Sequence, residues 1–217
     1  MPLDVPTVSY ALPEGVDPAG LLGYLDERFP VIAERGASRS YTVLDTADRR
    51  LRAAGVDLDL ETDRGGPRLV LREPGRRAPL VAEVRRPRRN RYLLRDVPAG
   101  PLRERLAPIV EMRALLPLAN VQVGAQLVRV LNADDKTVAR VSLATPVALV
   151  GSGDAGAVPL TPRVDVIGVL GYPTPLGRVT AAVRRGPKGG LVDAAASVAD
   201  EAIAATGGDP EGIRTKV

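Results

Sequence analysis

Apolar and acidic residues alternate between residues 55 and 66, where the sequence reads GVDLDLETDRGG. Three aliphatic side chains alternate there with three carboxylates, namely Val56, Leu58 and Leu60 with Asp57, Asp59 and Glu61. Successive side chains of a strand point to opposite faces. The pattern therefore predicts a β-strand with one apolar face and one acidic face, and we call Asp57, Asp59 and Glu61 the acidic stripe.

Similar short segments recur along the chain, separated by turns that contain Gly or Pro, as in antiparallel hairpins. The predicted strands are 7–12, 38–46, 56–62, 67–73, 79–86, 120–132, 137–150 and 162–170. The two longest segments, 120–132 and 137–150, have the strand-turn-strand form of a hairpin.

Helical signals lie between these strands. Asp17 stands before Pro18, which is the order of an N-cap and a first helical residue, and an apolar side formed by leucines follows. Further helical segments are predicted at 47–55, 99–110 and 191–206. Eight strands with a few helices outside predict an α+β fold, an eight-stranded antiparallel β-barrel with peripheral helices. We expect residues 1–206 to form one domain and 207–217 a tail or linker.

Composition restricts the chemistry. The chain has 217 residues, of which 45% are apolar, so it can build one larger barrel or two small domains. It contains neither Cys nor His, which excludes thiolate nucleophiles, Ser-His triads and imidazole metal sites. Any reaction would depend on carboxylates, Lys, Arg, Tyr or an oxygen-bound cation such as magnesium.

No run of eighteen apolar residues and no basic start before an apolar segment is present. We therefore expect a cytoplasmic protein with no membrane partner. The formal charge is +4, and the chain has one Phe and no Trp. Stacking platforms for single-stranded nucleic acid cannot be built from so few aromatic residues, so specific nucleic-acid binding is not expected.

Four segments in order resemble the CYTH domain, the triphosphate tunnel fold. They read LDTADRRLRAAGVDLDL at 44–60, LLPLANVQV at 115–123, DDKTVARVSLATPVAL at 134–149 and VIGVLGYPTPLGRV at 166–179. The resemblance covers residues 7–183. It implies an eight-stranded tunnel in which basic side chains hold a triphosphate and acidic ones hold magnesium or manganese. It also implies a CHAD-type domain as a partner.

This chain departs from the CYTH pattern at the residues that would carry the reaction. The Glu-x-Glu-x-Lys motif of the first strand falls on Val5, Thr7 and Ser9, and later metal ligands fall on Arg140 and Ala144.

Cationic positions of the pattern are changed as well. Asp57 and Asp59 stand where the family has Arg-x-Arg, and Asn120 stands where it has Arg. The resemblance therefore implies a degenerate site, a pseudoenzyme.

Three interpretations of the acidic stripe remain open. It can be the solvent-facing side of an edge strand. It can face inward and pair with Arg68, Arg72 and Arg140, which would offset the cost of burying charge. It can also bind a metal, but carboxylates two residues apart on a strand are about 6 to 7 Å apart, so another strand would have to supply a ligand.

The run RRPRRNRYLLR at 85–95 is either a solvated connection or a patch for a polyanion such as polyphosphate. Two Gly-rich segments, GSGDAGA at 151–157 and RRGPKGG at 184–190, lack the spacing of nucleotide-binding loops and are predicted to be plain loops.

The hypothesis that follows is a non-catalytic binding or interaction module that needs no cofactor and takes a phosphorylated or other anionic ligand. The arginines nominated for binding are Arg68, Arg72, Arg85, Arg140 and Arg163. The alternative is a triphosphatase or polyphosphatase that uses Mg2+ or Mn2+. Its metal ligands would be Asp57, Asp59, Glu61, Glu83 and Asp165. A third possibility is a salt-bridged scaffold without a ligand.

Overall fold

The computed structural model describes residues 7–63, 65–73, 78–87, 89–150, 156–187, 190–193, 196–209 and 212. The chain forms two compact units, each assembled from several stretches. The first contains Met1–Arg39, Val123–Pro146 and Pro159–Ser197, and the second contains Ser40–Gln122, Val147–Val158 and Val198–Val217. A single domain over residues 1–206 remains a prediction.

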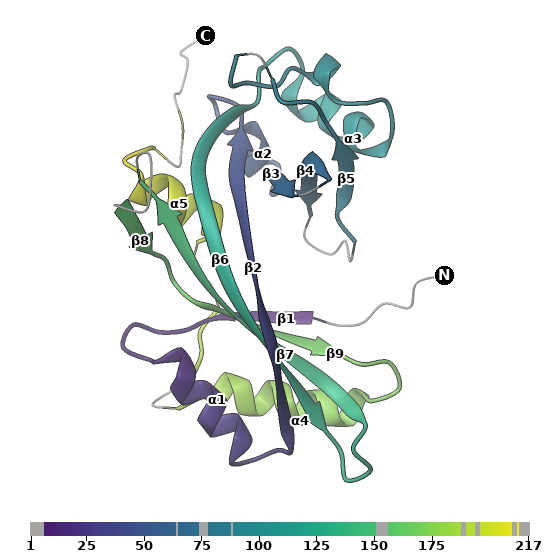
Figure 1. Ribbon diagram of the computed structural model, residues 1–217, viewed down its shortest axis with the longest axis vertical. Coiled ribbons are helices and arrows are strands. Elements are labelled where there is room, and N and C mark those ends of the chain that lie inside the picture. Colours follow the sequence, from purple (N-terminus) through teal and green to yellow (C-terminus); the bar gives the residue numbers. More distant parts are fainter. Residues whose placement is uncertain are drawn as a thin grey trace. The chain divides into compact units, whose positions relative to one another are not determined.

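Antiparallel strands and two helices form the first unit (Figure 1). Its own elements are β1 (Thr7–Ala11), α1 (Pro18–Asp26), β9 (Arg163–Gly168) and α4 (Pro173–Arg185), and it shares β2 (Val31–Asp45), β6 (Leu116–Leu131) and β7 (Thr137–Leu149) with the second unit. Strand β9 pairs antiparallel with β1 on one side and β7 on the other. Leu21 and Leu25 of α1 and Val179 and Val183 of α4 are buried in one core with apolar residues of these strands.

The second unit is built around a three-strand meander. Its elements are α2 (Arg50–Ala53), β3 (Asp57–Asp63), β4 (Gly66–Arg72), β5 (Leu80–Glu83), the 3-10 turn η1 (Leu94–Asp96), α3 (Pro101–Val110), β8 (Ala157–Pro159) and α5 (Val198–Ala205). Leu58 of β3 lies opposite Leu71 of β4. Both are fully buried in a core that includes Leu102 and Leu106 of α3, so the apolar face predicted for this strand is confirmed.

The α+β class and the antiparallel sheet are confirmed, but the predicted eight-stranded barrel is not closed. The described strands follow the order β1-β9-β7-β6-β2-β3-β4-β5, and β8 pairs with β7. Closure would require pairing between the two ends of this order, and none joins β1 to β5 in the described ranges. One end offers little to pair with, since β5 has only four residues.

Local signals fix several element boundaries. The side chain of Asp17 accepts a hydrogen bond from the Ala19 amide at 3.1 Å, and Pro18 begins α1, as predicted. Gly55 ends the segment after α2 with a φ of 68°, a backbone conformation that favours glycine.

Helix α4 is absent from the predictions because Pro173, Pro175 and Gly177 suggest a break in helical structure. Both prolines lie in the first turn, where the backbone N–H groups have no helical partner, so they do not interrupt the helix. The segment 184–190, predicted as a loop, starts inside the last turn of α4, and its residues 188 and 189 lie outside the described part.

The C-terminal helix is shorter than the 16 residues predicted, because α5 spans only Val198–Ala205. The loop at 151–157 falls mostly outside the described residues, which resume at residue 156. In the expected tail, the carbonyl of Asp209 accepts hydrogen bonds from Arg49 at 2.9 and 3.2 Å, while residues 213–217 lie outside the described part. None of the helices in the described ranges is long and apolar enough to cross a lipid bilayer.

Candidate anion-binding site

The acidic stripe of β3 faces arginines on the neighbouring strand β4. Arg72 forms ion pairs with Asp59 and with Glu61, the latter at 2.9 Å, and Arg68 pairs with Glu61 at 2.8 Å. We call Asp59, Glu61, Arg68 and Arg72 the charge ladder. Pairing of two stripe residues, Asp59 and Glu61, with Arg68 and Arg72 is thus confirmed, but these partners lie on an adjacent strand and do not cross a barrel.

Burial explains why this pairing is needed. The side chains of Asp59 and Glu61 are only 6% and 12% exposed, whereas those of Arg72 and Arg68 are 36% and 42% exposed. A carboxylate removed from water is costly unless a cation and hydrogen bonds compensate it. The hydrogen bond to Glu61 also raises the pKa of Arg68. These two arginines therefore serve the fold first, and an anion would have to compete with carboxylates for them.

Two further carboxylates lie beside the ladder. Asp45 is buried and accepts hydrogen bonds from the backbone amides of Thr46, Leu51 and Arg52 at 2.6, 2.9 and 3.1 Å, so it holds the start of α2. Burial nevertheless raises its pKa above the usual value. Asp45 thus satisfies backbone N–H groups at the start of α2, a local structural role.

Asp57, the first residue of the stripe, differs from Asp59 and Glu61. Asp57 is exposed by surface area, and partial desolvation of its carboxylate raises its pKa. The charges of Asp200 and Asp45 raise the pKa further, and that of Arg72 opposes them. Asp57 therefore carries its charge at a cost.

The five carboxylates nominated as metal ligands do not form a ligand set in the described part of the chain. Asp59 and Glu61 are paired with arginines, and Glu83 lies opposite Arg68 in the register of β4 and β5. Asp165 accepts a hydrogen bond from the Ser9 hydroxyl at 2.6 Å and belongs to the first unit. Within the described ranges, no three carboxylates are grouped so that they could hold a metal ion.

The remaining nominated arginines are divided between the units. Arg140 is exposed on β7, opposite Ile167 of β9, and Arg163 donates a hydrogen bond to the carbonyl of Ala196 at 2.9 Å. Both belong to the first unit. Arg85 lies in the second unit, just after the end of β5, where it lines a groove with other arginines.

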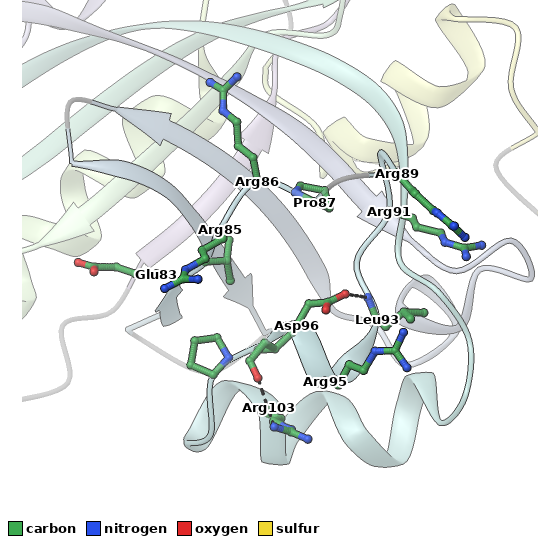
Figure 2. Close-up of a pocket in the computed structure, with 13 residues that line it drawn as sticks. Glu83, Arg85, Arg86, Pro87, Arg89, Arg91, Leu93, Arg95, Asp96 and Arg103 are labelled. Carbon is green, nitrogen blue, oxygen red and sulfur yellow. Dashed lines mark hydrogen bonds between the residues drawn. The ribbon is translucent and has the colours of Figure 1, made fainter.

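This groove has a volume of about 940 Å³ and is open to solvent. Its walls come from the connection after β5, from η1 and from α3 (Figure 2). We call it the arginine groove, after the six arginines that line it: Arg85, Arg86, Arg89, Arg91, Arg95 and Arg103.

Buried residues at intervals fix the connection that carries these arginines. Val84, Tyr92 and Val97 are 9%, 1% and 0% exposed and belong to the core of the second unit. The backbone of Tyr92 exchanges hydrogen bonds with that of Leu115 at 2.9 and 2.8 Å. Between these anchors the described residues form no regular strand, and the arginines that line the groove take outward positions.

The groove is strongly basic. Its two acidic residues are Glu83 and Asp96, and Asp96 already accepts a hydrogen bond from the amide of Leu93 at 2.8 Å (Figure 2). Among the described residues, none forms an ion pair or hydrogen bond with the side chains of Arg85, Arg89, Arg91 or Arg95. Their cationic groups are thus available to an anion from solution.

Sequence reasoning identified this site only in part. The run 85–95 suggested a polyanion patch, but Arg85 was the one residue nominated from it. The sequence did not indicate that Arg103 belongs to this site. Arg103 lies on α3, 12 or more residues from most of the run, and reaches the groove only because the chain folds.

Comparisons with known proteins give no assignment. No protein-family model matches the chain, and no curated protein matches it. A Bacillus halodurans structure described as "a putative adenylate cyclase" aligns at 10% identity and a TM-score of 0.43, over 81% of this chain and 83% of that one. A Vibrio parahaemolyticus structure with the same description aligns at 12% identity and a TM-score of 0.38, over 82% and 84%. Likenesses at these scores assign neither family nor function to the chain.

Proposed function

We propose that this chain is a non-catalytic binding module that holds a phosphate-rich anion in the arginine groove. The observation that carries this proposal is the set of six arginines around one groove that has only two acidic residues. Guanidinium groups bind phosphate oxygens in pairs of parallel hydrogen bonds, and they remain charged at any physiological pH. A tripolyphosphate or a longer polyphosphate offers several such oxygens along a flexible chain.

The sequence resemblance to the CYTH domain supports the same class of ligand. The segments of the motif are present in order, but the acidic and basic residues of the reaction are replaced. Two of the arginines left on the strands, Arg68 and Arg72, are paired with carboxylates of the charge ladder. We therefore place the anion in the arginine groove and not along the strands. Binding there needs no metal cofactor, because the arginines themselves neutralise the phosphate charge.

A CHAD-type domain as the partner remains a prediction from the resemblance. The described carboxylates supply no grouped ligand set for a hydrolase that uses Mg2+ or Mn2+. We therefore do not propose that activity, and the test below would detect it.

The test is a calorimetric titration with tripolyphosphate, with and without magnesium, together with a phosphate-release assay on the same samples. We expect binding without phosphate release. In the triple variant Arg89→Gln/Arg91→Gln/Arg95→Gln, the affinity should fall at least about tenfold, because three charge-assisted contacts are removed.

A charge-matched control is available on α4, where Arg178, Arg184 and Arg185 are exposed. Their triple change to Gln removes the same net charge but alters none of the residues that line the groove, so the affinity should stay within about twofold. An equal loss in both variants would show that binding is non-specific. Release of phosphate would show that the module is an enzyme.

A further inference from the structure

A second cavity of the second unit lies next to the arginine groove. Its volume is about 560 Å³, within the range of small-molecule sites. Leu44 and Leu60 provide part of its wall, and Tyr92 and Asn120 also line it. We call this cavity the tyrosine pocket. Arg86 lines both the groove and the pocket, and Figure 2 shows its side chain extending away from Asp96 and Arg103.

Tyr92 has an unusual environment. Its side chain is 1% exposed, and its hydroxyl has no hydrogen-bond partner in the part of the chain that the structure describes. Buried polar groups in proteins are almost always hydrogen-bonded, so a buried, unpartnered hydroxyl on a residue that lines a cavity indicates a missing polar atom. Burial raises the pKa of Tyr92, and the nearby charge of Arg86 opposes that rise. The hydroxyl is therefore protonated at neutral pH and can donate a hydrogen bond.

Asn120 adds a second donor. Its side-chain oxygen accepts a hydrogen bond from the hydroxyl of Thr42 at 2.7 Å, which leaves the amide N–H groups available. The pocket thus combines an aliphatic wall, a phenol, an amide and one guanidinium. Inorganic polyphosphate would make poor use of the aliphatic wall, because charged oxygens gain nothing from apolar contact.

We propose that the tyrosine pocket binds a small organic acid, separately from the anion of the arginine groove. The carboxylate or phosphate monoester group of this compound pairs with Arg86. Its compact apolar body packs against Leu44 and Leu60, and an acceptor atom receives the hydrogen bond of the Tyr92 hydroxyl. The proposal does not depend on polyphosphate binding.

Benzoate and phenyl phosphate are suitable probes, with benzamide as the uncharged comparison. Saturation-transfer NMR and titration of the intact chain should show that both acids bind, in the millimolar range, and that benzamide binds at least about fivefold more weakly. The variant Arg86→Gln should remove the preference for the acids. If neither acid binds, or if benzamide binds equally well, the proposal is wrong.

Tyr92→Phe removes only the hydroxyl. Because that group has no partner among the residues that the structure describes, the variant should unfold at the same denaturant concentration as the parent chain or a higher one, while its affinity for both acids falls about fivefold. Unchanged affinity, or a clear loss of stability, would overturn the proposal, the latter because it would reveal a structural role for the hydroxyl. The groove variant Arg89→Gln/Arg91→Gln/Arg95→Gln should bind both acids normally, which separates this site from the polyanion site.

Discussion

Asp57 has a carboxylate whose neighbours oppose its ionisation. Desolvation raises its pKa above the usual 3.8, and the carboxylates of Asp200 and Asp45 add to the effect. An acid with a raised pKa in the folded state holds its proton more tightly when folded than when unfolded. Stability from this group is therefore lost as pH rises from about 3.8 through the folded pKa, and the ionised form is unfavourable at neutral pH.

The change Asp57→Asn should consequently raise the melting temperature near pH 7 and have little effect near pH 3. Thermal unfolding followed by circular dichroism over this range would measure it. Asp134→Asn, at an exposed position in the turn between β6 and β7, is the control and should change stability equally at both pH values. A stabilisation by Asp57→Asn that does not vary with pH would contradict this account.

At the scale of elements, β3 and β4 are held together by two different faces. Leu58 and Leu69 bury one face against α3, while the charge ladder occupies the other. Asp59 on this second face is buried and forms an ion pair with Arg72. Loss of Arg72 should therefore destabilise the protein.

Arg72→Ala should lower the free energy of unfolding by about 2 kcal/mol, less than for a fully buried pair because Arg72 is partly exposed. The double variant Asp59→Asn/Arg72→Ala should recover about half of that loss, because the buried carboxylate that loses its Arg72 partner is then neutral. Urea denaturation of the two single variants and the double variant provides a double-mutant cycle. Additive losses would show that the two residues do not stabilise one another.

Strands β2 and β6 approach closely in the first unit. A Cβ on Gly36 would lie 2.6 Å from the carbonyl oxygen of Ala125, which is backbone and cannot turn away. The change Gly36→Ala should therefore destabilise the protein by about 1 to 3 kcal/mol. The same change at Gly20 in α1 meets no atom within 4 Å and should stabilise by up to about 1 kcal/mol. Equal effects of the two changes in urea denaturation would exclude a steric role for Gly36.

At the scale of the whole molecule, the net charge of +4 is small, and positive charge is concentrated locally. The arginine groove places six guanidinium groups around one open site. Binding that depends on such a site is strongly salt-dependent, because ions in solution screen it.

Tripolyphosphate affinity should therefore fall at least about tenfold between about 50 and 200 mM salt. The logarithm of the affinity against that of the salt concentration should have a shallower slope for the triple groove variant than for the α4 control. Calorimetry at four salt concentrations would measure both slopes. Affinity that does not change with salt would indicate that the arginines do not bind the anion.

The sequence by itself determined the local order: the two faces of β3, the meander that follows it, the N-cap of α1 and the helix α3. Each of these depends on residues close together in the chain, whose side-chain direction follows from the period of a strand or helix. The pairing of the stripe with Arg68 and Arg72 was also within reach, because both strands belong to one hairpin.

Only the tertiary structure decided the open strand order, the presence of α4 and the grouping of the arginines. The groove collects Arg85, Arg95 and Arg103 from a loop, a 3-10 turn and a helix, and the tyrosine pocket joins Tyr92 to residues of β2, β3 and β6. Their proximity depends on long-range packing around Val84, Tyr92 and Val97. No local period encodes it, since the same alternation is compatible with many arrangements of the strands.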